Sequence, residues 1–466
     1  MTNNPTNRRD FLKTSTALAA TASLPYWFQA QPARGFDTPN ERPILGCIGT
    51  GGRWRAVGPA AMNFADCVAV CDVDSAHTDA AHAIVKKHQP GDRKISKHGD
   101  YREILDNKNI DIVTIATPDH WHVKIGIEAM QAGKDVYCEK PLTLTIEEGR
   151  QICQVARDTK RVFQVGTQQR SGYNQMFLKA IALARAGRLG KIENVECVIG
   201  GVEPCGHIKA VDPPKTLDWE MWQGQTPLVD FRFEDGGGDF RDDKSRCHWS
   251  FRWWYEYSGG NMTDWGAHHV DIAQWLIGQN GPDQGPSRIE PIMYEHSVPL
   301  DEQGMPTRKD RFNVANKYHV RATFPEEVTI DIKSEGRNGI LVTGSEGRIF
   351  VNRGALEGKP VEDLASNPLP EDAIAEVYGG KRPHTDGNGT VAHMHNFIDC
   401  VSSREQPISD VFSHHRALTT CHLSNIAMRL GRPLTWDPIA QEIQDDPQAR
   451  SMQAREQRKG YEIRVS

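Results

Sequence analysis

The chain has no excess of positive charge. Its 466 residues contain 55 lysines and arginines against 61 aspartates and glutamates, which gives a formal net charge of -6. Proteins that bind nucleic acids or anionic membrane surfaces neutralise phosphates with basic side chains. The balance of charge therefore argues against nucleic acid and membrane surfaces as partners.

The sequence also has no paired cysteine motif and no long apolar run. Its ten cysteines include no C-x-x-C pair, so it indicates neither a zinc site nor a disulfide framework. We interpret the cysteines as buried thiols. No apolar run approaches the ~20 residues that cross a bilayer, and we expect no stable membrane insertion.

The N-terminus differs in composition from the rest of the chain. NRRDFLK, at residues 7–13, joins two arginines to Phe11 and Leu12, and a mildly apolar stretch of small residues follows. This arrangement resembles a twin-arginine export signal. We assign residues 1–35 to a signal and linker, with the twin-arginine machinery as partner and the periplasm as destination. An ordinary basic tail is the alternative.

Strand and helix patterns alternate from Pro43 onwards, in a chain long enough for two domains. The predicted strands are ILGCIGTGG, CVAVCDVD, DIVTIATP and KDVYCEKP, and helical patterns separate them. Strands joined by single helices form parallel sheets. We therefore expect an α/β domain of the Rossmann type over residues 43–165.

The pattern changes near Gly166, where strand-like runs joined by turn residues predict a large, mostly antiparallel open sheet. The expected fold class is thus α/β plus α+β, with a substrate-binding and oligomerisation domain over 166–436. An irregular stretch over 201–260, rich in Pro, Gly, Asp and aromatics, is interpreted as a substrate-side insertion. Residues 437–466 are charged and are expected to form a surface tail.

A glycine turn follows the first predicted strand. GTGGRW supplies the first two glycines of a G-x-G-x-x-G pattern, which lets backbone N–H groups approach a pyrophosphate. Trp54 stands in place of the third glycine, and we expect it to push the next helix off the strand. Asp72 ends the second strand, where a carboxylate accepts from the ribose hydroxyls of NAD and repels a 2′-phosphate. NAD is favoured, while Arg53 and Arg55 keep NADP possible.

Two polar motifs stand at the carboxyl ends of later strands, where open α/β sheets bind ligands. They are ATPDHWH, at residues 116–122, and CEKP, at residues 138–141. Lys140 is therefore expected to face the cofactor crevice. Pro141 biases it towards an extended backbone and is a candidate for a cis peptide bond.

These motifs resemble the Gfo/Idh/MocA oxidoreductases, named for glucose-fructose oxidoreductase and inositol dehydrogenase. The matching stretches are GCIGTGGR, VAVCDVD, ATPDHWH, CEKPLT and DWGAHHVDIAQWLIG. The resemblance implies a Rossmann domain, and a second domain whose open sheet often makes oligomer contacts. A homo-oligomer, dimer or tetramer, is expected. It also implies hydride transfer with a carbohydrate or cyclitol substrate. The residues expected at the cofactor are Gly49, Thr50, Gly51, Gly52, Arg53, Asp72, Thr117, Pro118, His122, Glu139 and Lys140.

The second domain contributes TDWGAHHVDIAQW, in which Asp264, His268 and Asp271 are spaced to share one helical face. Such a set can bind metal, but it has no further predicted ligand, and we expect no metal. By resemblance, Lys140 and His268 handle the proton and Asp264 orients or shares it, and either of the pair could be the base. The residues expected to contact substrate are Arg170, Tyr173, His269 and Asp271, and for His269 a packed or hydrogen-bonded position in the core is the open alternative.

The stretch CHWSFRWWYEYSGG leaves two interpretations open, a wall for sugar C–H faces or an apolar core. Arg246 and Arg252 within it are candidates for binding substrate oxygens. A C-terminal set of histidines is expected mostly at the surface; it comprises His393, His395, His414, His415 and His422.

Three functions are compatible with these features. The first is an exported NAD-dependent dehydrogenase that acts on a secondary alcohol of a sugar, cyclitol or sugar derivative. The second is a redox-neutral enzyme that uses bound NAD to oxidise a glycoside, eliminate the aglycone and return the hydride. The third is a non-catalytic dinucleotide- or sugar-binding protein. Because the periplasm supplies no free nicotinamide, we expect the protein to be exported with its cofactor bound.

Overall fold

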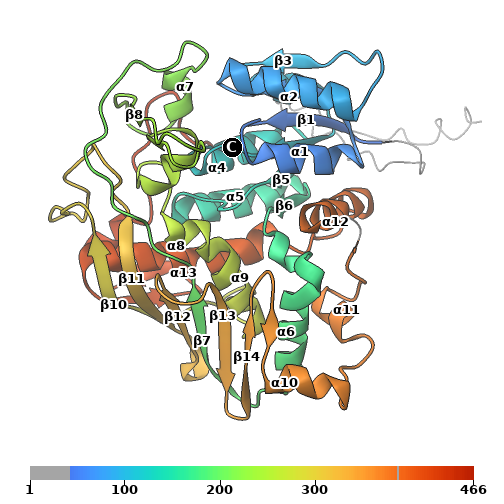
Figure 1. Cartoon of the computed structure of the whole chain (residues 1–466), viewed down its shortest axis with the longest axis vertical. Helices are drawn as coiled ribbons and strands as arrows, with labels where there is room; N and C mark the ends of the chain where they lie inside the picture. Colours follow the sequence, from blue (N-terminus) through green and yellow to red (C-terminus); the bar gives the residue numbers. More distant parts are fainter. Residues whose placement is uncertain (1–41, 386–387, 466) are drawn as a thin grey trace, which may run out of the picture. The chain divides into compact units, whose positions relative to one another are not determined.

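Six parallel strands form the first sheet of the computed structural model, which describes residues 42–385 and 388–465. The predicted signal and linker, 1–35, lie outside these residues. The strands are ordered β3-β2-β1-β4-β5-β6, which is the doubly wound Rossmann order (Figure 1). Their bounds are β1 (Ile44–Ile48), β2 (Asp66–Cys71), β3 (Ser96–His98), β4 (Ile112–Ile115), β5 (Asp135–Cys138) and β6 (Phe163–Val165). The predicted Rossmann fold is confirmed.

Helices α1 (Trp54–Met62), α2 (Ser75–His88), α3 (Arg102–Asp106), α4 (Asp119–Gln131) and α5 (Ile146–Thr159) connect these strands. Trp54 begins α1 and is fully buried. A Cβ on Gly58 would lie 2.3 Å from Cε2 of its indole. Gly58, one turn into the helix, therefore makes room for the Trp54 ring. The sequence led us to expect that Trp54 pushes α1 away from the strand, and this space makes such a displacement unnecessary.

The second sheet has nine strands, in the order β15-β14-β13-β7-β12-β11-β10-β16-β17. Only β7 and β12 pair in parallel, so the predicted mostly antiparallel sheet is confirmed. The strands are β7 (Ile192–Val198), β10 (Arg288–His296), β11 (Ala315–Thr323), β12 (Thr329–Lys333), β13 (Gly339–Gly344), β14 (Gly347–Val351), β15 (Leu356–Glu357), β16 (Leu434–Asp437) and β17 (Glu442–Gln444).

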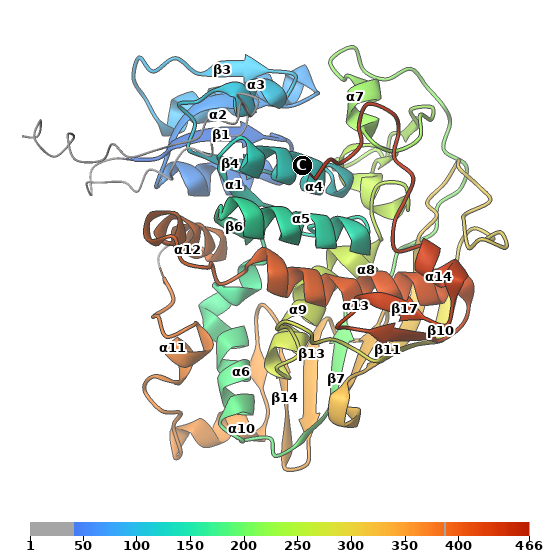
Figure 2. The same ribbon diagram turned by 180° about the vertical axis from the view of Figure 1, so that it is seen from behind.

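Helices pack on one side of this sheet and join it to the first domain. Figures 1 and 2 show α13 (Val411–Leu430) running between α5 and the second sheet, beside α9 (Gly266–Leu276). The other helices of this half are α6 (Met176–Arg185), α8 (Asn261–Asp264), α10 (Lys359–Glu362), α11 (Ala373–Val377) and α12 (Gly389–Ser403).

The irregular stretch before α8 has a small core of its own. It contains α7 (Trp219–Gln223), β8 (Phe233–Glu234), β9 (Lys244–Ser245) and the 3-10 helix η5 (His248–Trp253). We call residues 201–260 the inserted segment. Ile208, Trp222, Trp254 and Tyr257 are buried together within it.

The C-terminal residues correct one expectation. Residues 437–466 were expected to form a surface tail, but β16 and β17 extend the second sheet and α14 (Pro447–Ser451) packs behind them. Ile443 and Ala449 are fully buried. The final residues then reach the first domain, where Lys124 Nζ of α4 donates to the carbonyl of Glu462 at 3.0 Å. Two buried apolar residues and backbone pairing fix this segment despite its charge.

The C-terminal histidines are also placed differently from the prediction. Four of the five are buried in helices α12 and α13, and three of these, His393, His415 and His422, have a hydrogen-bond partner that satisfies the neutral imidazole. His393 Nε2, for example, lies 2.9 Å from the carbonyl oxygen of Val165. The buried four are His393, His414, His415 and His422, and only His395 is half-exposed.

All ten cysteines are free thiols, and every one is buried except the half-buried Cys205, as the sequence predicts. Among the described helices, none combines the length and the apolar character that a membrane crossing needs.

Candidate active site

A cleft of about 660 Å³ opens at the carboxyl ends of the first sheet's strands. One wall comes from the loops that follow β1, β2, β4 and β5, and the other from the inserted segment. Cavities of this size hold drug-sized or larger ligands. Its position at the carboxyl ends of the strands is the one at which open parallel sheets bind nucleotides.

The glycine turn forms the floor of the cleft. Gly49 has φ +76°, and a Cβ there would lie 2.6 Å from the backbone nitrogen of Thr117, so only glycine is accommodated. Gly52 has no atom within 4 Å of the position of a Cβ, which leaves its backbone open to a ligand. This open backbone fits the pyrophosphate of a dinucleotide.

Most residues expected at the cofactor line this cleft. They are Gly49, Gly51, Gly52, Arg53, Asp72, Thr117, Pro118, Glu139 and Lys140. Thr50 is buried, and its backbone N–H donates to Asp72. His122 is buried as well, because its two ring nitrogens lie 2.7 Å from the Pro141 oxygen and 2.9 Å from the Thr117 oxygen. His122 therefore positions two loops of the site and does not reach the cofactor space.

Asp72 is held in place by backbone groups. Its two carboxylate oxygens accept from the N–H of Thr50 at 2.7 Å and of Asp74 at 2.9 Å. His77 Nδ1 lies 3.4 Å from the same carboxylate. Burial alone would lower the pKa of His77, but the hydrogen bond and charge of Asp72 outweigh it and raise that pKa. Asp72 remains able to accept from ribose hydroxyls, since a carboxylate has several lone pairs.

Arg53 forms an ion pair within the site. Its guanidinium lies 2.9 Å from Oε1 of the buried Glu139, which also accepts from Gln168 Nε2 at 2.8 Å. The pair links the glycine turn to the loop that carries Lys140.

Lys140 reaches across the cleft to the second domain. The peptide bond between it and Pro141 is cis. Lys140 Nζ lies 2.5 Å from Asp264 Oδ1 and donates to the Asp264 carbonyl at 3.1 Å. Burial alone would raise the pKa of Asp264, yet the charges of Lys140 and Arg252 lower it to about 2. Asp264 is therefore an ionised anchor for two cations.

His268 lies one helical turn beyond Asp264, in α9, and is almost fully buried. Burial lowers its pKa well below the usual value, and the nearby charges of Lys140 and Arg353 lower it further. Its Nδ1 has no hydrogen-bond partner among the residues that the structure describes. The low pKa keeps the imidazole neutral near pH 7, so its unused nitrogen can accept a hydrogen bond from a bound hydroxyl group.

Two residues of the cleft were not singled out as site residues. Asp119 follows the Thr117–Pro118 turn, lines the cleft and accepts from Ser258 Oγ at 2.5 Å. Burial raises its pKa to about 7. Arg252, which was a candidate for binding substrate oxygens but was not expected beside Asp264, lines the cleft with Nε 3.4 Å from Asp264 Oδ1. The position of Asp119 directly after a strand end was the available signal for it.

The residues expected to contact substrate are not brought to the cleft. Arg170 and Asp271 are fully buried and form a bidentate pair, with distances of 2.7 and 2.6 Å. His269 is also fully buried, between Gln169 and Asn338. The half-buried Tyr173 lies under the Arg353 guanidinium, 4.9 Å from its ring centre. Each of these side chains is engaged by another part of the protein, which corrects the expectation.

The aromatic stretch is divided between the cleft and a core. Trp249 and Phe251 line the cleft, and Arg252 stacks over both. Trp254 and Tyr257 instead belong to the core of the inserted segment. Arg246 is buried against Glu256 and is not a substrate contact.

The fold and the glycine turn together define a Rossmann-type dinucleotide-binding protein. A family model described as an oxidoreductase family with an NAD-binding Rossmann fold matches residues 44–167, and the model of its C-terminal alpha/beta domain matches 205–377 and 386–463. The chain belongs to the Gfo/Idh/MocA oxidoreductase family, as the motifs predict. A model of the twin-arginine translocation signal matches residues 5–25, so the chain carries that export signal.

Solved structures with the same fold include sugar dehydrogenases. Levoglucosan dehydrogenase in complex with NADH and L-sorbose is 20% identical, with a TM-score of 0.57 over 85% of this chain and 99% of its own. The WlbA dehydrogenase from Bordetella pertussis, in complex with NADH and UDP-GlcNAcA, is 19% identical, with a TM-score of 0.56 over 84% and 97%.

The curated relatives include a glycosidase, in contrast to the dehydrogenases among the solved structures. An alpha-N-acetylgalactosaminidase from Shewanella oneidensis is 34% identical over 126 residues, which are 27% of this chain and 27% of the relative. The chain therefore matches about a quarter of that relative's length.

Proposed function

We propose that the protein transfers hydride between a nicotinamide cofactor and a secondary alcohol carbon of a sugar, cyclitol or sugar derivative. The observation that supports this most is the Lys140–Asp264 ion pair, next to His268 and beside an open glycine turn. Lys140 lines the cleft whereas Asp264 and His268 do not, so Lys140 is the residue that links the dinucleotide site to the proton-transfer group. The aromatic side chains of Trp249 and Phe251 offer a surface of the kind that packs on sugar C–H faces.

Oxidation of an alcohol needs a base for the hydroxyl proton. Bound NAD supplies the hydride acceptor. We infer that neutral His268 accepts the proton, while Lys140 donates a hydrogen bond to the hydroxyl oxygen and Asp264 holds the ammonium in place. In the reverse direction the imidazolium returns the proton. The inserted segment covers one side of the cleft and limits the access of water.

A second candidate is favoured by the glycosidase relative. In this reaction the enzyme oxidises a ring hydroxyl of a glycoside, which acidifies the neighbouring C–H so that the aglycone is eliminated. Water then adds and the hydride returns to the same carbon, with no net change in the cofactor. Asp119, whose pKa is about 7, would be a second proton-transfer group in the same cleft.

One screen separates these functions. Purified protein would be incubated with a panel of sugars, cyclitols and glycosides, with NADH absorbance and released aglycone followed together. Accumulating NADH supports the dehydrogenase, and aglycone without NADH supports the redox-neutral enzyme. Dinucleotide binding without turnover of any compound would indicate the binding protein. The same preparation would be tested for the homo-oligomer that the family resemblance implies, by light scattering.

A further inference from the structure

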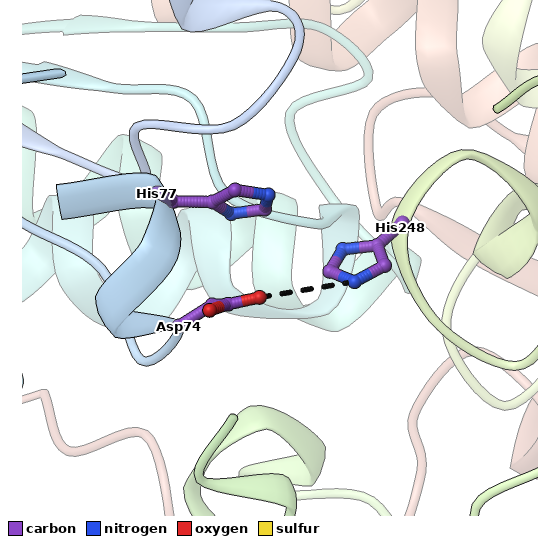
Figure 3. A group of neighbouring side chains, drawn as sticks. All are labelled: Asp74, His77 and His248. Carbon is purple, nitrogen blue, oxygen red and sulfur yellow. Dashed lines mark ion pairs between the residues drawn. The ribbon is translucent and has the colours of Figure 1, made fainter. Parts of the chain in front are cut away.

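Three potential metal ligands meet at the rim of the cleft. Asp74, His77 and His248 each offer one ligand atom, and these atoms all lie within 4.8 Å of one another. Figure 3 shows the two imidazole rings and the carboxylate facing a common space. All three residues line the cleft.

The three ligand atoms need to move only slightly to bind one metal ion. His248 Nε2 lies 3.9 Å from Asp74 Oδ2, and the two imidazole rings are 5.1 Å apart between centres. Ligand bonds of about 2.0–2.1 Å place neighbouring ligands roughly 3.4 Å apart around a tetrahedral ion. The His77 and His248 side chains are 28% and 40% exposed, so both can rotate by the small amount needed.

The surroundings favour a cation. Asp72 lies behind His77, with Oδ2 3.4 Å from Nδ1, which is the position of a carboxylate that orients a metal-bound histidine. Asp243 lines the same part of the cleft, and the charge of Arg55 opposes these carboxylates from the side of the glycine turn. Two nitrogens and one oxygen suit a transition ion such as Zn²⁺ better than Mg²⁺ or Ca²⁺.

We propose that Asp74, His77 and His248 bind one divalent transition metal ion, which ties the inserted segment to the Rossmann domain above the cofactor cleft. The ligands come from both sides. Asp74 caps α2 and His77 lies in its first turn, whereas His248 begins η5 in the inserted segment.

The inserted segment already touches this corner through its backbone. Ser75 N–H donates to the Thr216 carbonyl at 2.9 Å, and Asp218 N–H donates to the Val73 carbonyl at 2.9 Å. A metal bond to His248 adds a second attachment at the same corner, through the 3-10 helix η5. The ion thereby holds the cleft closed over a bound dinucleotide, a consequence that rests on the proposed cofactor site.

Metal binding is tested without any cofactor or substrate. Purified, chelator-treated protein would be titrated with Zn²⁺ by calorimetry, and Co²⁺ would be added separately to record its visible absorption. We expect one high-affinity Zn²⁺ per chain and a Co²⁺ spectrum of a nitrogen and oxygen site. His248→Ala and His77→Ala should each weaken Zn²⁺ binding at least about tenfold.

His88→Ala is the matched control, because His88 is an exposed histidine of the same helix α2. It should bind Zn²⁺ as the unaltered protein does. The proposal is wrong if the unaltered protein binds no stoichiometric Zn²⁺ and gives no Co²⁺ spectrum, or if His248→Ala binds Zn²⁺ with unchanged affinity.

The effect on the cofactor is measured by NADH fluorescence with and without Zn²⁺. Zn²⁺ should tighten NADH binding about fivefold or more in the unaltered protein and in His88→Ala, but not in His248→Ala. If Zn²⁺ binds stoichiometrically but leaves the affinity for NADH unchanged, the ion does not hold the inserted segment closed over the dinucleotide, and that part of the proposal is wrong. Failure to bind NADH at all, with Zn²⁺ bound, would refute the proposed cofactor site and leave the metal site standing.

Discussion

Lys140 connects the two halves of the active site at the scale of a single residue, since it follows a strand of the first sheet and pairs with Asp264 of the second domain. Replacing it with Ala removes both the hydrogen bond to substrate and the positive charge beside His268. We expect kcat to fall about 10²- to 10⁴-fold, the usual contribution of a proton-transfer group. Steady-state kinetics on a substrate from the panel would measure this.

Lys179→Ala is the control for that experiment, because Lys179 is an exposed lysine of α6. Its kcat should be unchanged. Full turnover by Lys140→Ala would remove Lys140 from the mechanism.

Asp72 determines which dinucleotide is preferred. A 2′-phosphate would meet its carboxylate, and the positive charge of Arg53 is partly offset by its ion pair with Glu139. We expect the unaltered protein to bind NAD more tightly than NADP, and Asp72→Ala to lose most of that difference. Calorimetric titration with both dinucleotides measures the two affinities. Asp79→Ala, at an exposed aspartate of α2, should keep the preference; equal affinities in the unaltered protein would contradict the assignment.

Residues at strand ends were predictable, and buried charge pairs were not. Gly49, Asp72 and Lys140 follow strands that apolar runs predict, so the sequence places them at one edge of the sheet. The partner of a buried arginine is not encoded locally. Arg170 and Asp271 lie about a hundred positions apart and satisfy each other, which no spacing rule indicates.

At the scale of elements, α1 depends on a glycine that has no ligand role. Alanine usually stabilises a helix interior relative to glycine by about 1 kcal/mol. At Gly58 a methyl group would instead collide with the buried Trp54 ring. We expect Gly58→Ala to lower the free energy of unfolding by about 1–3 kcal/mol. Urea denaturation measures it.

Gly206→Ala serves as the comparison, since no atom lies within 4 Å of the Cβ position there. That variant should differ little from the unaltered protein. A Gly58→Ala protein as stable as the original would show that the Trp54 ring moves freely.

Helices and strands were predicted well where apolar residues recur in a pattern along the sequence. They were predicted poorly where backbone hydrogen bonds between strands determine the structure. Strands β1, β4 and β5 are buried apolar runs, so their existence follows from the pattern. Strand β3, with the sequence Ser-Lys-His, has no such run and was not predicted. The strand β17 has one buried apolar residue, Ile443, between the polar residues Glu442 and Gln444. Its pairing with β16 gives no periodic signal, and the sequence therefore indicated a tail.

At the scale of the whole molecule, buried histidines make stability depend on pH. Burial lowers the pKa of six of them to about 3 or 4, against an ordinary value of 6.5; they are His120, His269, His393, His414, His415 and His422. The unfolded chain therefore binds more protons than the folded one between pH 6.5 and about 4. Stability should be full above pH 6.5 and be lost as the pH falls through this window.

Two buried carboxyls act in the opposite direction. Burial raises the pKa of Asp119 and of Glu148 to about 7, so their protonation favours the folded state as the pH falls. The histidines are more numerous, and each excess proton bound by the unfolded chain is worth about 1.4 kcal/mol per pH unit. We expect a clearly lower urea midpoint at pH 5.0 than at pH 7.5. An equal or higher midpoint at pH 5.0 would contradict this account.

The export signal and the dinucleotide site together make a prediction about cofactor retention. The twin-arginine pathway carries folded proteins, and the compartment outside supplies no free nicotinamide. We expect protein recovered from the periplasm to release dinucleotide when it is denatured, in close to one equivalent per chain. An enzymatic cycling assay measures the released cofactor. Absence of dinucleotide, or mature protein only in the cytoplasm, would refute the prediction.

The packing of α12 against α1 sets an order of events during synthesis. Met394 and Phe397 complete the core around Trp54, so the first domain cannot close until a helix near the end of the chain has been made. At about 5–20 residues per second, translation of the intervening chain takes on the order of tens of seconds. The export signal thus leaves the ribosome long before its cargo can be folded, and a nascent chain must be protected from premature engagement by the translocase during that interval.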